Sequence, residues 1–291
     1  MQTRPLGPGA PTVSVVGLGA MPLSIPGRPD EGTAVRVIHA ALDAGMTLVD
    51  TADAYCLDEH DVGHNERLVA KALRSWGGRR DQVLVATKGG ITRSGGAWGQ
   101  DGRPASLRRA CERSLRALGV DCIPLYQFHR PDPDVPFAES VGALAGLRRE
   151  GKVRWVGLSN VSVAQIREAA AIVPVTTVQN RLSPFFREAL EDGVVAHCAQ
   201  QGIGVLAYSP VGGGRLNRKL PAMEPLWAIG RAHGASPHAV VLAWVLAQGP
   251  TVIVIPGART PEHTTDSAAA AALTLTAEDL AAIDTAAFDR S

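Results

Sequence analysis

Four ionisable side chains, those of Asp50, Tyr55, Lys88 and His129, lie at or just past the ends of three apolar runs in this sequence. The runs are MTLVD (46–50), VLVATK (83–88) and PLYQFH (124–129). In a sheet of parallel strands, side chains at the carboxyl ends gather around a ligand, so we expect these four to share one pocket. A carboxylate, a phenol, an ammonium and an imidazole together can donate a proton. The pattern predicts an enzyme.

The chemistry of this set follows from the properties of the phenol. A free tyrosine has a pKa of about 10 and is a poor acid at neutral pH, but a nearby ammonium stabilises the phenolate. We therefore expect Lys88 to lower the pKa of Tyr55, with Asp50 holding Lys88 in place as its counter-charge. His129 would hydrogen-bond an oxygen on which negative charge grows, as happens when a carbonyl is reduced.

The elements that must position these residues are eight β-branched runs that alternate with helical stretches, a pattern typical of parallel α/β folds. The predicted strands cover residues 13–20, 46–52, 82–88, 123–129, 153–159, 176–181, 204–210 and 251–257. The predicted helices cover residues 33–44, 66–75, 106–118, 137–150, 163–171, 189–200, 237–248 and 261–271. Eight strand and helix pairs in strict order favour an α/β fold of the (β/α)8 TIM-barrel type, with an N-terminal β-hairpin and an extra C-terminal helix over 277–288.

Composition limits the other functions that this chain can have. With 291 residues, of which 45% are hydrophobic and 20% charged, we expect one barrel domain over 1–291. A net charge of +1 without long charged runs argues against nucleic acid and membrane partners. The four cysteines lack the spacing of a zinc site, and no leader or membrane segment is recognisable. We expect a cytoplasmic protein, by default a monomer, that acts on a small molecule.

Three loops on the expected catalytic face carry unusual compositions. Residues 89–104 and 211–219 are rich in glycine, and the second of these follows the seventh strand, where barrels commonly bind phosphate. The loop 56–66 gathers Asp58, Glu59, His60, Asp61 and His64, but without a spacing that would aim them at one ion. We interpret it as a solvated loop and expect no metal.

Taken together, these segments resemble the aldo-keto reductases, in particular their bacterial, channel-β-subunit-like branch. The similar segments are LVDTADAY (48–55), VATKGG (85–90), LYQFHRPD (125–132), GKVRWVGLSN (151–160), VQNRLSP (178–184), AYSPVGGG (207–214) and VIPGARTPEH (254–263). The resemblance implies NADP-dependent reduction of an aldehyde or ketone to an alcohol. It also implies that Tyr55 is the general acid, that Lys88 and Asp50 tune it, and that His129 orients the carbonyl.

The same resemblance implies a set of NADP(H)-binding residues. Ser159, Asn160 and Gln179 would hydrogen-bond the nicotinamide carboxamide, and Tyr208 would stack beneath the ring. The pyrophosphate would lie against Ser209, Pro210, Val211, Gly212, Gly213 and Gly214, followed by Leu216 and Lys219. At the far end of the cofactor, the implied contacts are Gly257, Arg259, His263, Asp266 and Ser267.

Arg259 opens the helix after the eighth strand, where a guanidinium suits a 2′-phosphate and favours NADPH over NADH. His263, Asp266 and Ser267 replace residues that are more usual in the family, so contacts to adenine are expected to be looser. Cys56 replaces the common glycine after the tyrosine; we interpret it as a small loop residue rather than a redox switch. Trp98, Phe185 and Phe186 are candidates for the substrate pocket, although the two phenylalanines would equally suit packing onto the barrel.

Two other classes of function remain open at this stage. A cofactor-bound sensor or accessory subunit with little turnover fits the channel-β-subunit resemblance. A glycoside hydrolase using Asp50 and Glu66 would leave Lys88, Arg259 and the glycine loop unexplained. The identity of the carbonyl substrate is left open, because the loops that shape its pocket vary freely.

Overall fold

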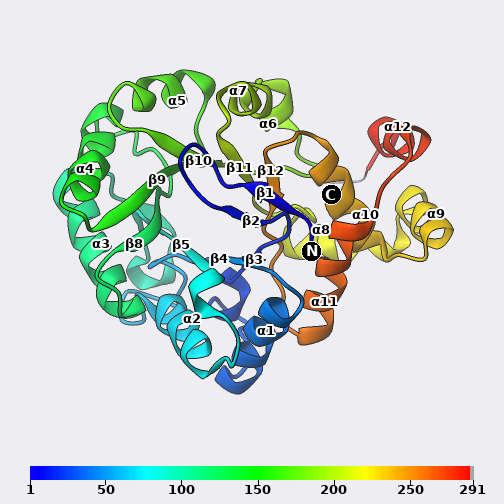
Figure 1. The fold of residues 1–291 in the computed structure, drawn as a ribbon, viewed down its shortest axis with the longest axis horizontal. Helices are drawn as coiled ribbons and strands as arrows, with labels where there is room; N and C mark the ends of the chain where they lie inside the picture. The colour runs from blue at the N-terminus through cyan, green and yellow to red at the C-terminus, as the bar shows by residue number, and fades with distance from the viewer. Residues whose placement is uncertain (289–291) are drawn as a thin grey trace.

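The computed structural model describes residues 1–288, and its centre is a parallel sheet rolled into a barrel (Figure 1). Neighbouring strands follow the order β12-β11-β10-β9-β8-β5-β4-β3, and parallel bridges from Val16 to Val254 and from Gly19 to Gly257 join the two edges. The strands are β3 (Leu18–Gly19), β4 (Leu48–Asp50), β5 (Leu84–Gly89), β8 (Ile123–Phe128), β9 (Val153–Ser159), β10 (Val175–Gln179), β11 (Gly204–Ala207) and β12 (Val252–Val254). The predicted TIM barrel is confirmed.

A ring of helices surrounds the sheet, as Figure 1 shows. These helices are α1 (Glu31–Asp43), α2 (His64–Ser75), α3 (Pro104–Leu118), α4 (Phe137–Arg149), α5 (Val163–Ala170), α7 (Val194–Gln201), α10 (Pro237–Ala247) and α11 (Pro261–Ala269). Several begin where the sequence supplies a capping side chain: Asp30 accepts from the Thr33 amide, and Ser162 and Gln165 form a capping box. Their apolar faces pack onto the outside of the strands and form the larger hydrophobic core.

The predicted N-terminal hairpin is present as β1 (Thr3–Pro5) paired antiparallel with β2 (Thr12–Ser14). Leu6 and Val13 from this hairpin are buried in a second core with residues from inside the barrel: Leu48, Leu84, Ala86, Leu125, Leu206, Ile253 and Ile255. The hairpin crosses the barrel in Figure 1 and lies at the amino ends of the strands. The carboxyl ends, where chemistry was expected, remain on the other side.

Several elements differ from the prediction. The run 13–20 is divided between β2 and the two-residue β3, and the helix predicted over 189–200 is divided into α6 (Glu188–Glu191) and α7 by Gly193, whose φ is 74°. The loop after β5 contains a small hairpin, β6 (Ile91–Thr92) with β7 (Gly99–Gln100). The stretch after β11 contains α8 (Gly213–Asn217) and α9 (Glu224–His233), neither of which is one of the eight predicted barrel helices; α8 falls in a stretch that was expected to be a glycine-rich loop.

The extra C-terminal helix is α12 (Ala277–Thr285), three residues shorter than predicted. Short 3-10 turns complete the described elements: η1 (Met21–Leu23), η2 (Arg80–Gln82), η3 (Ser94–Gly96), η4 (Leu220–Ala222) and η5 (Ala270–Ala272). Within residues 1–288, none of the helices combines the length and apolar character needed to cross a bilayer.

Candidate active site

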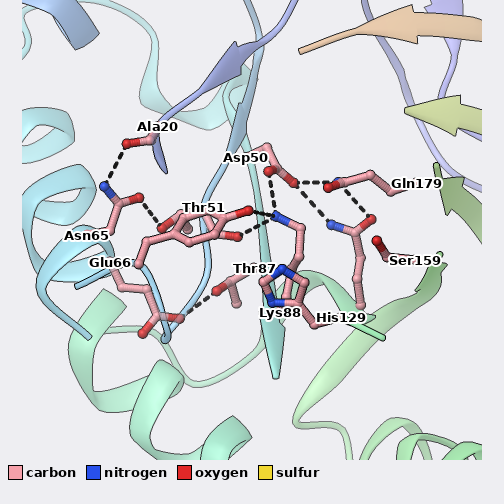
Figure 2. Close-up of polar contacts among 12 residues, drawn as sticks. Ala20, Asp50, Thr51, Asn65, Glu66, Thr87, Lys88, His129, Ser159 and Gln179 are labelled. Carbon is pink, nitrogen blue, oxygen red and sulfur yellow. Dashed lines mark hydrogen bonds and ion pairs between the residues drawn. The ribbon is translucent and has the colours of Figure 1, made fainter. Parts of the chain in front are cut away.

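Asp50, Lys88 and His129 lie together at the carboxyl ends of β4, β5 and β8 (Figure 2), and Tyr55 follows the end of β4 by five residues. The Lys88 ammonium, which is fully buried, donates to the Asp50 carboxylate at 2.5 Å and to the Tyr55 hydroxyl at 2.9 Å. A third hydrogen bond from Lys88 goes to the Thr51 carbonyl at 3.0 Å. The ring centroids of Tyr55 and His129 are 5.7 Å apart in an edge-on arrangement. The structure therefore brings together all four predicted side chains.

The electrostatics of Tyr55 differ from the expectation in one respect. Burial raises the pKa of Tyr55 above its ordinary value of 10.0, and this outweighs the lowering that Lys88 produces. For Lys88, burial lowers the pKa, but the charges of Asp50 and Tyr55 outweigh burial and the net pKa is raised. The prediction of a lowered Tyr55 pKa was therefore wrong for the site as it stands. The phenol keeps its proton at neutral pH beside a charged lysine.

His129 is 8% exposed and its ring makes no hydrogen bond to any residue that the structure describes. Burial, with smaller contributions from Lys88 and Arg130, holds its pKa well below 6.5. The imidazole is consequently neutral at pH 7, with one N–H to donate. A neutral donor without a partner, beside the phenol, matches the requirements of a group that orients a carbonyl oxygen.

Two amides complete the surroundings of Asp50, and sequence reasoning identified only one of them. Gln179 donates through Nε2 to Asp50 Oδ1 at 2.8 Å, and Gln127 donates to the same oxygen at 3.2 Å. Gln179 Nε2 also lies 3.3 Å from Gln127 Oε1. Gln127 was missed, although strand periodicity was a usable signal: it stands two residues before His129 and so faces the same way.

A second group of hydrogen-bonded side chains, Ser159, Asn160 and Tyr208, lies next to this network at the ends of β9 and β11. The Tyr208 hydroxyl donates to Asn160 Oδ1 at 2.8 Å, and Asn160 Nδ2 donates to Ser159 Oγ and to the His129 carbonyl, both at 3.0 Å. Asn160 and Ser209 have φ values of 59° and 47°, the only positive values outside glycine within residues 1–288. Such backbone strain concentrates at functional sites. This hydrogen-bonded group therefore connects three of the predicted nicotinamide contacts, Ser159, Asn160 and Tyr208, to the backbone of His129.

The predicted phosphate segment follows β11 as an open turn. Gly212 and Gly213 have φ values of 82° and 83°, which a side chain would strain, and no atom lies within 4 Å of a Cβ placed on Gly213 or Gly214. Leu216, in contrast, is 2% exposed and packs in the core. The backbone of Gly213 and Gly214 thus borders open space at the start of α8, whereas Gly212 packs closely against Leu216 and Phe185.

The residues predicted to bind the adenine end of the cofactor contact different parts of the protein rather than one another. The Arg259 guanidinium donates to the carbonyls of Pro22 and Pro26 at 3.3 and 3.1 Å. Asp266 accepts from Ser236 at 2.7 Å, and Ser267 Oγ donates to the His263 carbonyl at 2.9 Å. His263 and Gly257 are exposed. Asp266 and Ser267 are therefore engaged with the protein itself, while Arg259 holds the loop after β3.

The remaining candidates lie around the mouth of the barrel. In the loop 56–66, Asp58, Glu59 and Asp61 point to separate partners, the His60 amide, the Gly95 amide and Arg28. Within the described residues, no three His, Cys, Asp or Glu side chains are placed to share a metal ion. These contacts favour the interpretation of residues 56–63 as a polar loop, whereas residues 64–66 of the predicted loop begin α2.

Cys56 and the aromatic candidates are also placed by the structure. Burial raises the pKa of Cys56 to about 11, which disfavours a reactive thiolate. Phe185 is fully buried against Phe288, with ring centroids 5.0 Å apart, so it packs in the core. Trp98 is 51% exposed on the β6–β7 hairpin and remains available to a ligand.

Comparisons with known proteins agree with this site. The model of the aldo/keto reductase family matches residues 15–287. The aldo-keto reductase str7 of Strobilurus tenacellus is 35% identical over 312 aligned positions, covering 94% of this chain and 89% of its own length. This chain therefore belongs to the aldo/keto reductase family, and is an oxidoreductase with the family's barrel fold.

Solved structures show the same similarity in three dimensions. A glycerol dehydrogenase from Gluconobacter oxydans, AKR11B4, is 31% identical with a TM-score of 0.84, covering 98% of this chain and 97% of its own. An aldo/keto reductase from Klebsiella pneumoniae, solved in complex with NADP and acetate, is 30% identical with a TM-score of 0.80, covering 97% and 94%. The resemblance found from sequence motifs is thus confirmed at the level of the family.

Proposed function

We propose that this chain reduces an aldehyde or ketone to an alcohol, with NADPH as hydride donor and Tyr55 as proton donor. The observation that carries the proposal is the 2.9 Å contact between the Tyr55 hydroxyl and the buried Lys88 ammonium, beside the unpartnered ring of His129. This arrangement offers a proton and a hydrogen bond to the same oxygen. Both are needed when a carbonyl accepts hydride on carbon.

The residues present suit a dinucleotide. Ser159 and Gln179 are nearly buried polar groups at the ends of neighbouring strands, and Gly213 and Gly214 border open space that a side chain would occupy. An NADP-bound relative with 30% identity adds support for the 2′-phosphorylated cofactor. When bound, the cofactor would supply the hydride from nicotinamide C4. Ser159, Asn160 and Gln179 would hold the carboxamide, and Tyr208 would support the ring.

The chain's own residues would then manage the proton. Tyr55 keeps its proton until negative charge develops on the carbonyl oxygen, because burial raises its pKa. Lys88 stabilises the phenolate that proton transfer leaves behind, and Asp50 keeps Lys88 charged. Neutral His129 donates its N–H to the carbonyl oxygen and fixes its position. Gln127 and Gln179 hold Asp50 in place from the opposite side.

The contacts of Glu66 weigh against the glycoside hydrolase considered above. Glu66 Oε1 accepts from Thr87 at 2.5 Å, and Thr87 precedes Lys88 on β5, so the two side chains leave opposite faces of the strand. Asp50 contacts Lys88 inside the barrel, whereas Glu66 lies outside it. Two carboxylates separated by the sheet wall are not arranged to flank one glycosidic bond.

The decisive experiment follows reduced nicotinamide absorbance with a panel of aldehydes and ketones, using wild type, Tyr55→Phe and Tyr126→Phe. Tyr126 is a fully buried tyrosine behind the site and serves as the matched control. Tyr55→Phe should lose about 10²- to 10⁴-fold in kcat, with NADPH binding unchanged by fluorescence quenching. A wild type that binds NADPH but turns over no carbonyl would instead favour the sensor or accessory-subunit function.

We also propose the finer assignments made from the motifs: membership of the channel-β-subunit-like branch, preference for NADPH over NADH, and a cytoplasmic monomer acting on a small-molecule carbonyl without nucleic acid or membrane. The motif order along the chain supports the branch, and Arg259, two residues before α11, supports the cofactor preference. Size-exclusion chromatography with light scattering would measure the molar mass and so test whether the protein is a monomer. Parallel assays with both cofactors would test the preference.

A further inference from the structure

Arg93 is a buried cation without a counter-charge. The side chain follows β6 and is 3% exposed; its Nε and Nη1 atoms have no hydrogen-bond partner among the described residues. In the part of the chain that the structure describes, the guanidinium makes one hydrogen bond, a donation from Nη2 to the Leu57 carbonyl at 2.9 Å. Burying an ionised group without pairing it is costly, so such a group usually pairs with a ligand or an ion when the protein works.

The acidic side chains of the neighbouring loop do not provide this partner. Asp58 accepts from the His60 amide at 2.9 Å, Glu59 from the Gly95 amide at 2.6 Å, and Asp61 pairs with Arg28 at 2.6 Å. No ion pair joins Arg93 to a carboxylate anywhere in residues 1–288. The nearby thiol of Cys56 cannot supply the charge either, because burial raises its pKa to about 11.

Arg93 lies on the catalytic face, in the loop after β5, and contacts the segment that follows the proposed proton donor. Leu57, which it contacts, comes two residues after Tyr55, and Arg93 comes five residues after Lys88. The glycine turn after β11 is across the barrel, because β11 is four positions from β5 in the eight-stranded order. A cofactor phosphate held by that turn would therefore not neutralise Arg93.

One aromatic side chain covers a face of the guanidinium. The Arg93 Cζ atom lies 3.8 Å from the ring centroid of Trp98, so the indole covers one face of the cation. Trp98 is itself 51% exposed. Rotation of this single half-exposed side chain would uncover Arg93 to a ligand that enters from the mouth of the barrel.

We propose that Arg93 pairs with a carboxylate carried by the carbonyl substrate, so that the preferred substrates are aldehydes or ketones bearing one negative charge. This rests on the proposed function and narrows its substrate class. One guanidinium matches one negative charge, and its two unpartnered nitrogens offer the donors that a carboxylate accepts. Trp98 would contribute an aromatic surface to the same substrate.

The test compares 4-carboxybenzaldehyde with its neutral isostere 4-formylbenzamide. Wild type should prefer the acid, and Arg93→Gln should reduce the ratio of the two kcat/KM values by about ten- to a hundredfold, the usual effect of a hydrogen bond to a charged group. The loss should appear mainly in KM, since the carboxylate is bound equally before and during the reaction. Arg93→Lys should restore part of the ratio. A purely structural role would lower activity on both aldehydes alike.

Two arginine variants serve as controls. Arg130, exposed directly after His129, is the competing cation, and Arg149, exposed at the end of α4, controls for net charge. Arg149→Gln should leave kcat/KM unchanged for both aldehydes. The proposal is overturned if wild type does not prefer the acid, or if Arg130→Gln removes the preference while Arg93→Gln retains it.

A binding measurement separates this proposal from the function itself. Calorimetry should show benzoate binding more tightly than benzamide to the NADP-loaded wild type, and this difference should disappear in Arg93→Gln. If neither aldehyde is reduced but benzoate still binds through Arg93, the proposed reaction fails while the anion site stands. If Arg93→Gln does not fold, equal affinity of wild type for benzoate and benzamide suffices to reject the anion site.

Discussion

Lys88 Nζ lies 2.9 Å from the Tyr55 hydroxyl and 2.5 Å from Asp50 Oδ2, in a position from which solvent is excluded. The ammonium thus stands between a carboxylate and a phenol. Because burial outweighs the lysine in setting the phenol's pKa, the site stores a proton rather than a phenolate. The lysine matters after the proton has left, when it faces two negative oxygens.

The dependence of the reaction on pH should reflect this stored proton. The pKa of Tyr55 is raised above 10.0, so the acid form persists through neutral pH and is lost only as pH rises above about 10. The pKa of His129 is well below 6.5, so its neutral form persists down to more acidic solutions. We expect kcat/KM for reduction to stay level between about pH 6.5 and 10. If kcat/KM, measured at saturating cofactor, declined between pH 7 and 9, this expectation would be contradicted.

Asp50 and Lys88 form a buried ion pair, so we expect the effects of their substitutions on the free energy of unfolding to be strongly coupled. Asp50→Asn leaves a buried ammonium uncompensated and should lower the free energy of unfolding by about 3–5 kcal/mol. Adding Lys88→Met removes that charge and should recover much of the loss, without restoring activity. Urea unfolding of the single and double variants measures the coupling.

A surface ion pair provides the control for this cycle. Arg79 and Asp81 form an exposed salt bridge, and Asp81→Asn should leave the free energy of unfolding nearly unchanged because solvent screens the pair. If the double variant is as unstable as the sum of its single variants, Asp50 and Lys88 do not act as a pair.

Much of this arrangement was predictable because it depends on periodicity. Apolar runs followed by helical stretches define the barrel, and the ends of the strands define where Asp50, Lys88 and His129 must meet. The short β3 and the short helix α8 were not read correctly, because the former has only two paired residues and the latter lies within a segment rich in glycine. Local signals are weakest in such segments.

Two kinds of feature could not be predicted from the sequence: those that depend on how deeply a side chain is buried, and those that depend on residues far away in the sequence. The net direction of the Tyr55 pKa depends on how completely the barrel buries it, which no local pattern encodes. Gln127 joins Asp50 across 77 positions of sequence. Arg93 resembles an ordinary loop arginine until the structure shows that it is buried without a partner.

Gln179 and Gln127 allow the nicotinamide assignment to be tested with a matched pair. Both donate to Asp50 Oδ1, at 2.8 and 3.2 Å, but only Gln179 was assigned to the carboxamide. Gln179→Leu should therefore raise the Kd for NADPH by about tenfold, equivalent to one lost hydrogen bond. Gln127→Leu should leave it within about twofold, while both variants lose similar stability. Equal losses of NADPH affinity, measured by fluorescence quenching, would show that Gln179 acts only through Asp50.

Glu66 should make the stability of the barrel depend on pH. It lies behind β5 with Thr87, near Asp53 and Arg113; burial, followed by the charge of Asp53, raises its pKa from 4.5 to about 8. Between these two values the folded state binds a proton that the unfolded state has lost, so stability falls as pH rises from 4.5 to about 8. The contribution is fully present below pH 4.5.

Glu66→Gln keeps the shape of the protonated acid and removes its titration. The free energy of unfolding of wild type minus that of this variant should therefore fall by roughly a few kcal/mol between pH 5 and 8.5, as followed by urea unfolding. Glu168→Gln, on the exposed face of α5, should give a difference that does not change with pH. If the Glu66→Gln difference is equally flat, Glu66 is ionised in the folded protein, and the buried cluster carries a net negative charge that Arg113 must balance.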